Sequence, residues 1–119
     1  MPSSEEMERL KHQSIQWINE IRHSHSLTPL VFDADLCAQA DEHVLFMNHQ
    51  NRLIATSANQ QVASTYLSLT IELLISFITV WMDLNPDILL NPTITKFGIS
   101  FYTNSYHMTY FTYYVSSSR

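Results

Sequence analysis

Apolar side chains recur at intervals of three and four residues in three stretches of the chain, and this spacing predicts three helices. The first helix is predicted over about residues 4–23. Two serines followed by Glu5 and Glu6 are typical of a helix start, because a serine caps free N–H groups and acidic side chains suit the positive end of the helix dipole. The predicted apolar face consists of Leu10, Ser14, Trp17, Ile18 and Ile21.

A second helix is predicted to end at about Asn48, after a break at Pro29 and a short extended piece over residues 30–33. Asp33 and Asp35 are both candidates for its capping residue. Its stripe is predicted to consist of Leu36, Ala40, His43 or Val44, and Met47. The polar residues 49–61 that follow are interpreted as a loop with one turn of helix.

The third predicted helix covers about residues 68–82 and is the most apolar of the three. Its stripe consists of Ile71, Leu74, Ile75, Ile78, Trp81 and Met82. The opposite face also carries Leu73, Phe77 and Val80, and a helix that is apolar almost all round is buried, paired with a partner or placed in a membrane. We expect it to be buried between two layers, whereas exposure of Phe77 and Val80 would mark a dimer face.

The longer run Val62–Leu84 is long enough to raise the question of a membrane span. Glu72 lies near its middle, and several serines and threonines dilute its hydrophobicity. A charge near the centre of a bilayer costs about 2.5–3.5 kcal/mol, so no membrane span is expected. Burial, an interface and membrane association all stay open for this run.

The C-terminal part of the chain predicts a β-hairpin. Residues 96–102 alternate loosely between apolar and polar, and residues 106–115 are rich in aromatic and β-branched side chains. Asn104-Ser105 between them is a turn signal, and residues 116–119 are interpreted as a polar tail. The single glycine, Gly98, is expected where no side chain fits.

Composition narrows the functional classes. The 119 residues fit one domain, 1–119, with no internal boundary. The formal net charge is -5 and the six basic residues are scattered, so a nucleic-acid partner is not expected. One cysteine, Cys37, permits no intramolecular disulfide and is interpreted as a buried thiol. No leader is recognisable at the N-terminus, so the protein is either cytoplasmic or had a leader that was removed.

Nucleophilic and phosphate-binding motifs are not visible. A Gly-x-Ser-x-Gly elbow and a glycine-rich phosphate loop both need more than the one glycine present. The histidines at the end of the first helix, His23 and His25, are interpreted as solvated. The residues therefore favour a protein that is not an enzyme, although the sequence does not decide this.

Three groups of residues resemble one known family. The first is Asn19 and Arg22, followed by the segment 27–33 (Leu-Thr-Pro-Leu-Val-Phe-Asp). The second consists of Trp81-Met82, Asn85-Pro86, Ile88-Leu89, Asn91-Pro92 and Gly98-Ile99. The third is the strand Tyr110-Phe111-Thr112-Tyr113. In this order they resemble the CAP superfamily: cysteine-rich secretory proteins, antigen 5 proteins, pathogenesis-related class 1 proteins and their bacterial relatives (SCP domains).

The resemblance implies an α+β fold, a three-layer α-β-α sandwich around a small antiparallel sheet. It also implies a cleft that in many members has two histidines and two acidic residues and sometimes holds zinc. Carried over to this chain, the cleft candidates are His49, His107, Asp83, Thr112 and Tyr113. His49 and His107 are the candidate metal ligands, with His43 as the alternative to His49, and neutral imidazoles do suit zinc.

The chain departs from the family pattern at several cleft positions. Ser64-Thr65 stand where the family has Glu-Asn, and Tyr113 replaces the glutamine of the closing strand. Asn85-Pro86-Asp87 replaces the bacterial Ser-Pro-Gly-His and lacks its histidine. The family fold is therefore expected to be kept while the cleft chemistry is degenerate.

Three functions follow as hypotheses. The first is a non-enzymatic CAP-like binding protein for a lipid, a sterol or a protein. The second is a divalent-metal-dependent, hydrolase-like enzyme that uses His49 and His107 with a carboxylate such as Asp83 or Glu72. The third is a structural or homo-oligomerisation module built on the helix 71–82 and the terminal aromatic strand. The resemblance also implies an extracellular location if a leader was removed.

Overall fold

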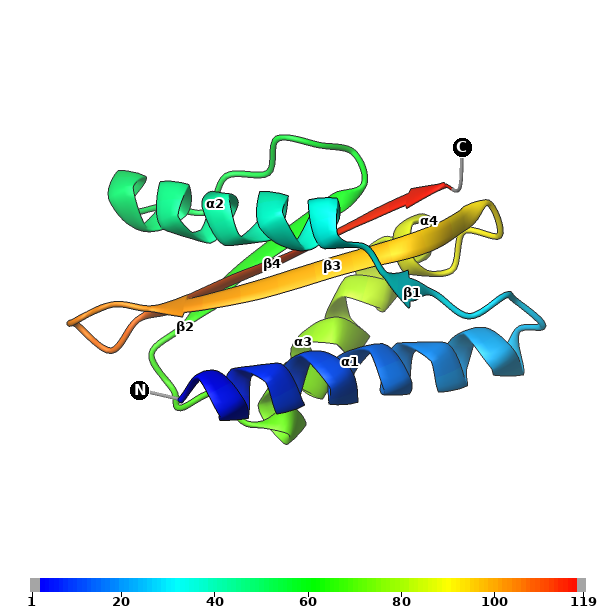
Figure 1. Cartoon of the computed structure of the whole chain (residues 1–119), viewed down its shortest axis with the longest axis horizontal. Coiled ribbons are helices and arrows are strands. Elements are labelled where there is room, and N and C mark those ends of the chain that lie inside the picture. The colour runs from blue at the N-terminus through cyan, green and yellow to red at the C-terminus, as the bar shows by residue number, and fades with distance from the viewer. Residues whose placement is uncertain (1–2, 118–119) are drawn as a thin grey trace.

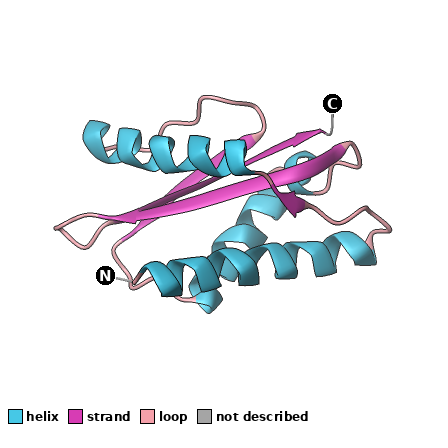
Figure 2. Ribbon diagram, in the orientation of Figure 1, coloured by secondary structure: helices cyan, strands magenta, loops and turns pink. Residues whose placement is uncertain are grey.

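The computed structural model describes residues 3–117 as three layers, with helices on both faces of one sheet (Figure 1). The elements in chain order are α1 (Ser4–Ser24), β1 (Val31–Phe32), α2 (Ala34–Gln50), β2 (Gln60–Thr65), α3 (Ile71–Leu84), α4 (Pro86–Leu89), β3 (Ile94–Thr103) and β4 (Thr109–Ser117). Helix α2 covers one face of the sheet, and α1 and α3 cover the other (Figures 1 and 2). The predicted α+β, three-layer arrangement is confirmed.

The sheet has four strands in the order β1-β3-β4-β2. Strands β3 and β4 form the predicted antiparallel hairpin, in which Phe101 lies opposite Phe111. Strand β2 joins β4 antiparallel, and the two-residue β1 joins β3 in parallel. The sheet is therefore antiparallel over three strands and mixed only at one edge. Strand β4 lies inside the sheet between β3 and β2, whereas β3 has β1 as its outer neighbour only at Lys96 and Phe97.

Several predicted boundaries are wrong. Residues 60–65, interpreted as the end of a loop and the start of an apolar run, form β2. Strand β4 begins at Thr109 rather than at residue 106, and Ser116 and Ser117 continue it instead of starting a polar tail. The last two residues of that predicted tail lie outside the described residues. The run Val62–Leu84 divides into part of β2, a loop and α3, because the turn-forming residues before α3 interrupt it.

Each long helix begins at a side-chain cap. Ser3 accepts a hydrogen bond from the N–H of Glu6 at 3.1 Å, and Thr70 accepts one from Leu73 at 3.2 Å. Asp33, not Asp35, caps α2 by accepting from the N–H of Leu36 at 3.0 Å. Such caps satisfy N–H groups that have no partner within the helix. The helices therefore start where the sequence offers an oxygen on a short side chain.

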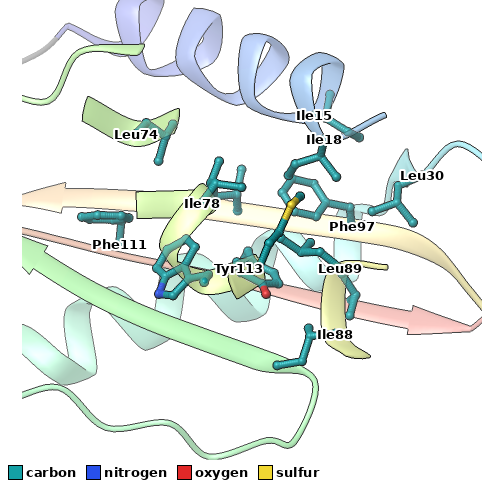
Figure 3. Packing of buried hydrophobic residues seen from close by; sticks show 14 of the residues in the cluster. Ile15, Ile18, Leu30, Leu74, Ile78, Ile88, Leu89, Phe97, Phe111 and Tyr113 are labelled. Carbon is teal, nitrogen blue, oxygen red and sulfur yellow. The ribbon is translucent and has the colours of Figure 1, made fainter. Parts of the chain in front are cut away.

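The main core lies between the sheet and the layer of α1, α3 and α4. Phe97, Phe111 and Tyr113 from the hairpin meet Ile18 of α1 and Ile78 of α3 there, each at most 1 % exposed (Figure 3). Because successive side chains of a strand point to opposite faces, the neighbouring tyrosines of β4 pack beneath α2 instead. The smaller cores on that face consist of Leu36, Ala40 and Tyr114, and of Val44, Met47 and Tyr110.

Gly98 of β3 lies directly against the first turn of α2. A β-carbon built on Gly98 would be 2.4 Å from the amide nitrogen of Cys37 and 2.4 Å from the carbonyl carbon of Leu36. Both atoms belong to the backbone, so neither can rotate out of the way. The expectation that no side chain fits at Gly98 is confirmed. The prediction that Cys37 is a buried thiol is wrong, since its side chain is half-buried.

Helix α3 packs with its apolar stripe toward the sheet but lies in an outer layer beside α1, so the expectation that it is buried between two layers is wrong (Figure 1). Phe77 contributes to the core through an edge-to-face contact with Phe111, at a distance of 4.9 Å between ring centroids. Val80, in contrast, is 52 % exposed. No helix among residues 3–117 combines the length and the hydrophobicity needed to cross a membrane.

Candidate functional site

Arg22 fixes the C-terminal end of α1 to two other segments. The side chain is 0 % exposed. Its guanidinium donates to the carbonyl oxygens of Thr28 (2.8 Å), Leu89 (2.7 Å), Asn91 (3.1 Å) and Ile94 (3.2 Å). Burial lowers the pKa of Arg22 below its usual value, but arginine keeps its charge in proteins. One side chain therefore holds together α1, α4 and the start of β3.

Next to this anchor, a groove lies between the C-terminal halves of α1 and α3, with Pro86 of α4 and Leu90 at one end. We call it the α1–α3 groove. Its lining residues are Trp17, Ile21, His25, Thr79, Met82, Asp83, Pro86 and Leu90. Its volume is about 470 Å³, within the range typical of small-molecule sites. The lining is mostly apolar, and polar side chains enter it only from the three residues His25, Thr79 and Asp83.

The imidazole of His25 is oriented by its own helix. Nδ1 lies 2.9 Å from the carbonyl oxygen of Ile21, which can only accept a hydrogen bond. Nδ1 therefore carries a proton, and in the neutral ring Nε2 is left as an acceptor. Asp83 adds an exposed carboxylate at the end of α3. The groove thus combines an apolar interior with two polar side chains that can accept hydrogen bonds from a ligand.

Thr112 and Tyr113 do not reach this groove and point to opposite sides of the sheet. The Thr112 hydroxyl donates to the carbonyl of Gln61 at 2.7 Å and accepts from Nε2 of Gln60 at 3.0 Å. The Tyr113 hydroxyl donates to Oε1 of Gln61, whose Nε2 donates to the carbonyl of Trp81 at 3.2 Å. These buried hydroxyls are saturated by neighbouring side chains and backbone. They join β4 to β2 and α3.

The environment of Tyr113 makes alkaline stability depend on this residue. Burial raises the pKa of Tyr113 above its ordinary value of 10.0, so the fold favours the protonated phenol. The resulting stabilisation is complete below pH about 10 and is lost as the pH rises further. We expect the free energy of unfolding to fall more steeply above that pH in the wild type than in Tyr113→Phe, which cannot ionise. Urea unfolding at a series of pH values measures both slopes.

At neutral pH the same substitution should cost about 1 kcal/mol, because it leaves Gln61 without its hydrogen bond. Tyr106→Phe is the matched control, since Tyr106 is 80 % exposed. Its stability should follow the wild-type curve at every pH. Parallel curves for wild type and Tyr113→Phe would show that ionisation of Tyr113 does not oppose folding.

The two predicted metal ligands are exposed on different elements. His49 lies in the last turn of α2, because that helix continues to Gln50 rather than ending at residue 48 as predicted. His107 lies in the β3–β4 turn, where its φ of 64° is in the left-handed region. His43, the alternative to His49, is 7 % exposed, and its Nε2 makes a hydrogen bond to the carbonyl of Ile54. His43 thereby holds the loop between α2 and β2.

The zinc site that the resemblance implied would require several side chains that converge on one point. Protein zinc sites use three or four nitrogen, sulfur or oxygen ligands around one point. Within residues 3–117 no group of three or more His, Cys, Asp or Glu side chains is arranged to hold a metal ion. The side chains of the described chain therefore do not fit the zinc site that the resemblance implied. Metal binding by His49 with His107 stays a prediction, one that would need ligands beyond this pair.

The sequence reasoning found one groove residue, Asp83, and missed the rest. Trp17 and Ile21 had been assigned to the apolar face of the first helix, which is correct, but the groove uses their partly exposed edges. Leu90 follows α4, a four-residue helix that the sequence did not predict. A signal was present, since the apolar helix α3 leads directly into a connection with Pro86 and Pro92 and leaves apolar side chains at its end.

The sequence of this chain matches one known protein family. The profile of the family described as "CAP: Cysteine-rich secretory protein family" matches residues 15–116. Among curated protein sequences no significant match is found.

Solved structures with a similar fold include one from a bacterium and two from hookworms. An outer surface protein from Borrelia burgdorferi superposes with a TM-score of 0.74 at 15% identity, over 99% of this chain and 97% of that one. The hookworm platelet inhibitor gives a TM-score of 0.69 at 14% identity, over 99% of this chain and 72% of the other. Manganese-bound Ac-ASP-7, an Ancylostoma-secreted protein, gives 0.62 at 12% identity, over 92% and 69%. At these identities the likeness concerns the fold.

Proposed function

This chain belongs to the CAP family, that of the cysteine-rich secretory proteins, and on that premise we propose that it is a non-enzymatic binding module for a small apolar ligand. The observation that carries the proposal is the α1–α3 groove. Its lining is apolar apart from a histidine, a threonine and an aspartate, and its volume of about 470 Å³ suits one lipid-sized molecule. Burial of apolar ligand surface in such a groove supplies the main driving force for binding.

The polar side chains narrow the class of ligand. The Asp83 carboxylate and Nε2 of His25 both accept hydrogen bonds, so the polar end of the ligand should donate one. A sterol or a fatty alcohol has such a hydroxyl on an otherwise apolar body. A fatty-acid carboxylate, by contrast, would meet the like charge of Asp83. We therefore favour a neutral lipid with one hydroxyl group over a free fatty acid.

The α1–α3 groove lacks the groups that a hydrolytic enzyme needs. Hydrolysis at neutral pH needs an activated nucleophile or a metal-bound water. The lining contains no serine or cysteine, and its one hydroxyl, on Thr79, donates to the carbonyl of Ile75 at 2.8 Å. The manganese in Ac-ASP-7 is a property of that protein. In this chain the lining of the α1–α3 groove supports ligand binding rather than catalysis.

The proposal predicts saturable binding of a fluorescent sterol, dehydroergosterol, to the wild-type protein. Leu90→Gln should weaken this binding about tenfold, because it replaces apolar contact surface in the groove with an amide. The matched control is Leu84→Gln, at the end of α3 next to Asp83 but 77 % exposed and outside the groove lining. Fluorescence titration gives the dissociation constant of each variant.

A second comparison separates the two kinds of lipid. Asp83→Asn removes the negative charge and should improve binding of the fluorescent fatty acid cis-parinarate, while binding of dehydroergosterol changes little. Absence of saturable binding for both lipids would refute the proposed function. Equal effects of Leu90→Gln and Leu84→Gln would place binding elsewhere on the surface.

A further inference from the structure

A second pocket lies at the other end of the sheet, where three segments distant in sequence meet. They are the first turn of α1, the loop from β2 to α3, and the ends of β3 and β4 beside their turn (Figure 1). We call it the hairpin pocket. The lining residues that matter for its chemistry are Glu6, Tyr66, Ser68, Thr103, His107 and Thr109. None of them belongs to the α1–α3 groove.

Two buried hydroxyl groups in this pocket have an unused hydrogen-bond donor. Thr103 is 7 % exposed and Thr109 is 3 % exposed. Their Oγ1 atoms lie 2.8 Å apart, and this is the one hydrogen bond that either hydroxyl makes within residues 3–117. Each hydroxyl has one proton, and a bond between the two uses only one of them. The pair can therefore donate a further hydrogen bond to a ligand in the pocket.

The charge of the lining selects against anions. It includes the carboxylate of Glu6, whereas the lining residues contain no lysine or arginine. Glu6 accepts hydrogen bonds, Ser68 can donate and accept, and His107 offers one ring nitrogen of each kind in its neutral form. The complementary ligand is therefore uncharged and carries both donors and acceptors on several sides.

The size and the rim of the pocket fit a ring rather than a chain. Its volume is about 210 Å³, less than half that of the α1–α3 groove. Tyr66 at the rim is 68 % exposed, so one face of its phenol ring is free to carry an apolar ligand surface. A pyranose has such a surface in the C–H groups of its ring, together with hydroxyls around its circumference.

From these observations we propose that the hairpin pocket binds one neutral pyranose unit of a carbohydrate. The sugar ring stacks on Tyr66, its hydroxyls exchange hydrogen bonds with Glu6 and His107, and the Thr103–Thr109 pair donates to a ring or hydroxyl oxygen. The sugar hydroxyls replace the hydrogen bonds of the displaced water, so the polar lining loses no partners on binding. This site is separate from the lipid groove and would give the module a second, polar ligand.

The test is a titration of the isotope-labelled full chain with methyl glucopyranoside, methyl galactopyranoside and methyl mannopyranoside, followed by backbone amide NMR. At least one of them should give saturable shifts confined to residues around the pocket. Tyr66→Ala should raise the dissociation constant about tenfold through loss of the stacking surface. Thr109→Val keeps the side-chain shape, loses the hydroxyl, and should raise it about fivefold.

Tyr106→Ala is the matched control for Tyr66→Ala. Tyr106 is also highly exposed, at 80 %, but does not line the pocket, so its removal should leave the dissociation constant unchanged. The exposed Tyr66 decides the outcome even if a buried threonine variant fails to fold. No saturable shift with any of the three sugars would overturn the proposal, as would equal effects of the two tyrosine variants.

Two further measurements distinguish sugar binding from cation binding in this pocket and from lipid binding in the α1–α3 groove. Choline tests whether the pocket instead recognises a positive charge through Glu6 and Tyr66, and tighter binding of choline than of any sugar would overturn the carbohydrate proposal. Leu90→Gln, which impairs the lipid groove, should leave sugar binding intact. Failure of lipid binding and failure of sugar binding are thus independent results.

Discussion

Replacing Gly98 with alanine should destabilise the protein by about 3 kcal/mol, a change expected to lower the melting temperature by roughly 12 °C in a chain of this size. The new methyl group would lie 2.4 Å from backbone atoms of Cys37 and Leu36, far inside van der Waals contact. Relief requires that the whole start of α2 move away from β3. Within a strand alanine is otherwise better than glycine by about 0.5–1 kcal/mol, so the expected loss is a net value after that gain.

Urea unfolding of the wild type and of Gly98→Ala measures this difference in the free energy of unfolding. Gly98 does not have a positive φ, so the cost is one of space and not of backbone conformation. Lys96→Ala is the control, because Lys96 lies on the same strand and is only half-buried. A Gly98→Ala protein as stable as Lys96→Ala would mean that α2 shifts without loss and that the close contact is not needed.

Arg22→Met should cost about 4 kcal/mol or more, a large part of the 5–15 kcal/mol that stabilises an ordinary domain. Methionine fills part of the space but donates no hydrogen bond. The carbonyl oxygens of Thr28, Leu89, Asn91 and Ile94 would then lose their donor in and around the core. Because no carboxylate pairs with Arg22 within residues 3–117, the loss arises from these carbonyls alone.

Arg22→Lys distinguishes charge from geometry. A lysine keeps the positive charge but lacks the planar fork of donors, so it should recover only part of the lost stability. Arg52→Met, at an exposed position after α2, is the control and should change stability little. Amide hydrogen exchange of Arg22→Met measures the loss locally, since the amide groups near α4 should lose protection first. Equal stability of Arg22→Met and Arg52→Met would contradict the anchoring role.

The long helices could be predicted because their signals are local. A cap, a stripe at helical spacing and a stop all lie within about twenty residues, and α1, α2 and α3 each have them. Strand β2 could not be predicted from its six residues Gln-Gln-Val-Ala-Ser-Thr, whose apolar content is too low. Gln60 is buried there because its amide reaches Thr112 across the sheet, a partner 52 residues away. Its burial depends on that partner and not on its own polarity.

The candidate site was also less predictable than the helices, because its contacts join residues that are far apart in the sequence. Arg22 stood out as part of a family motif, but the oxygens of Leu89, Asn91 and Ile94 are 67, 69 and 72 residues away. Backbone carbonyls have no signature in the sequence, so its role could not be derived in advance. Asp83 was chosen as the carboxylate nearest to the family's acidic position and lies in the groove, whereas His49 and His107 lie outside it. Family position located these residues along the chain but did not establish a shared site.

Strand β2 also bears on how this protein behaves at high concentration. It forms one edge of the sheet, and an edge strand is a template on which another chain can add. Sheets are protected from such growth by short edges and polar side chains, and β2 has both over Gln60–Thr65. The hydrophobic strand β4, which would be the aggregation-prone segment of the chain, is enclosed between β3 and β2. The polar sequence that made β2 difficult to predict thus also protects the β4 side of the hairpin from self-association.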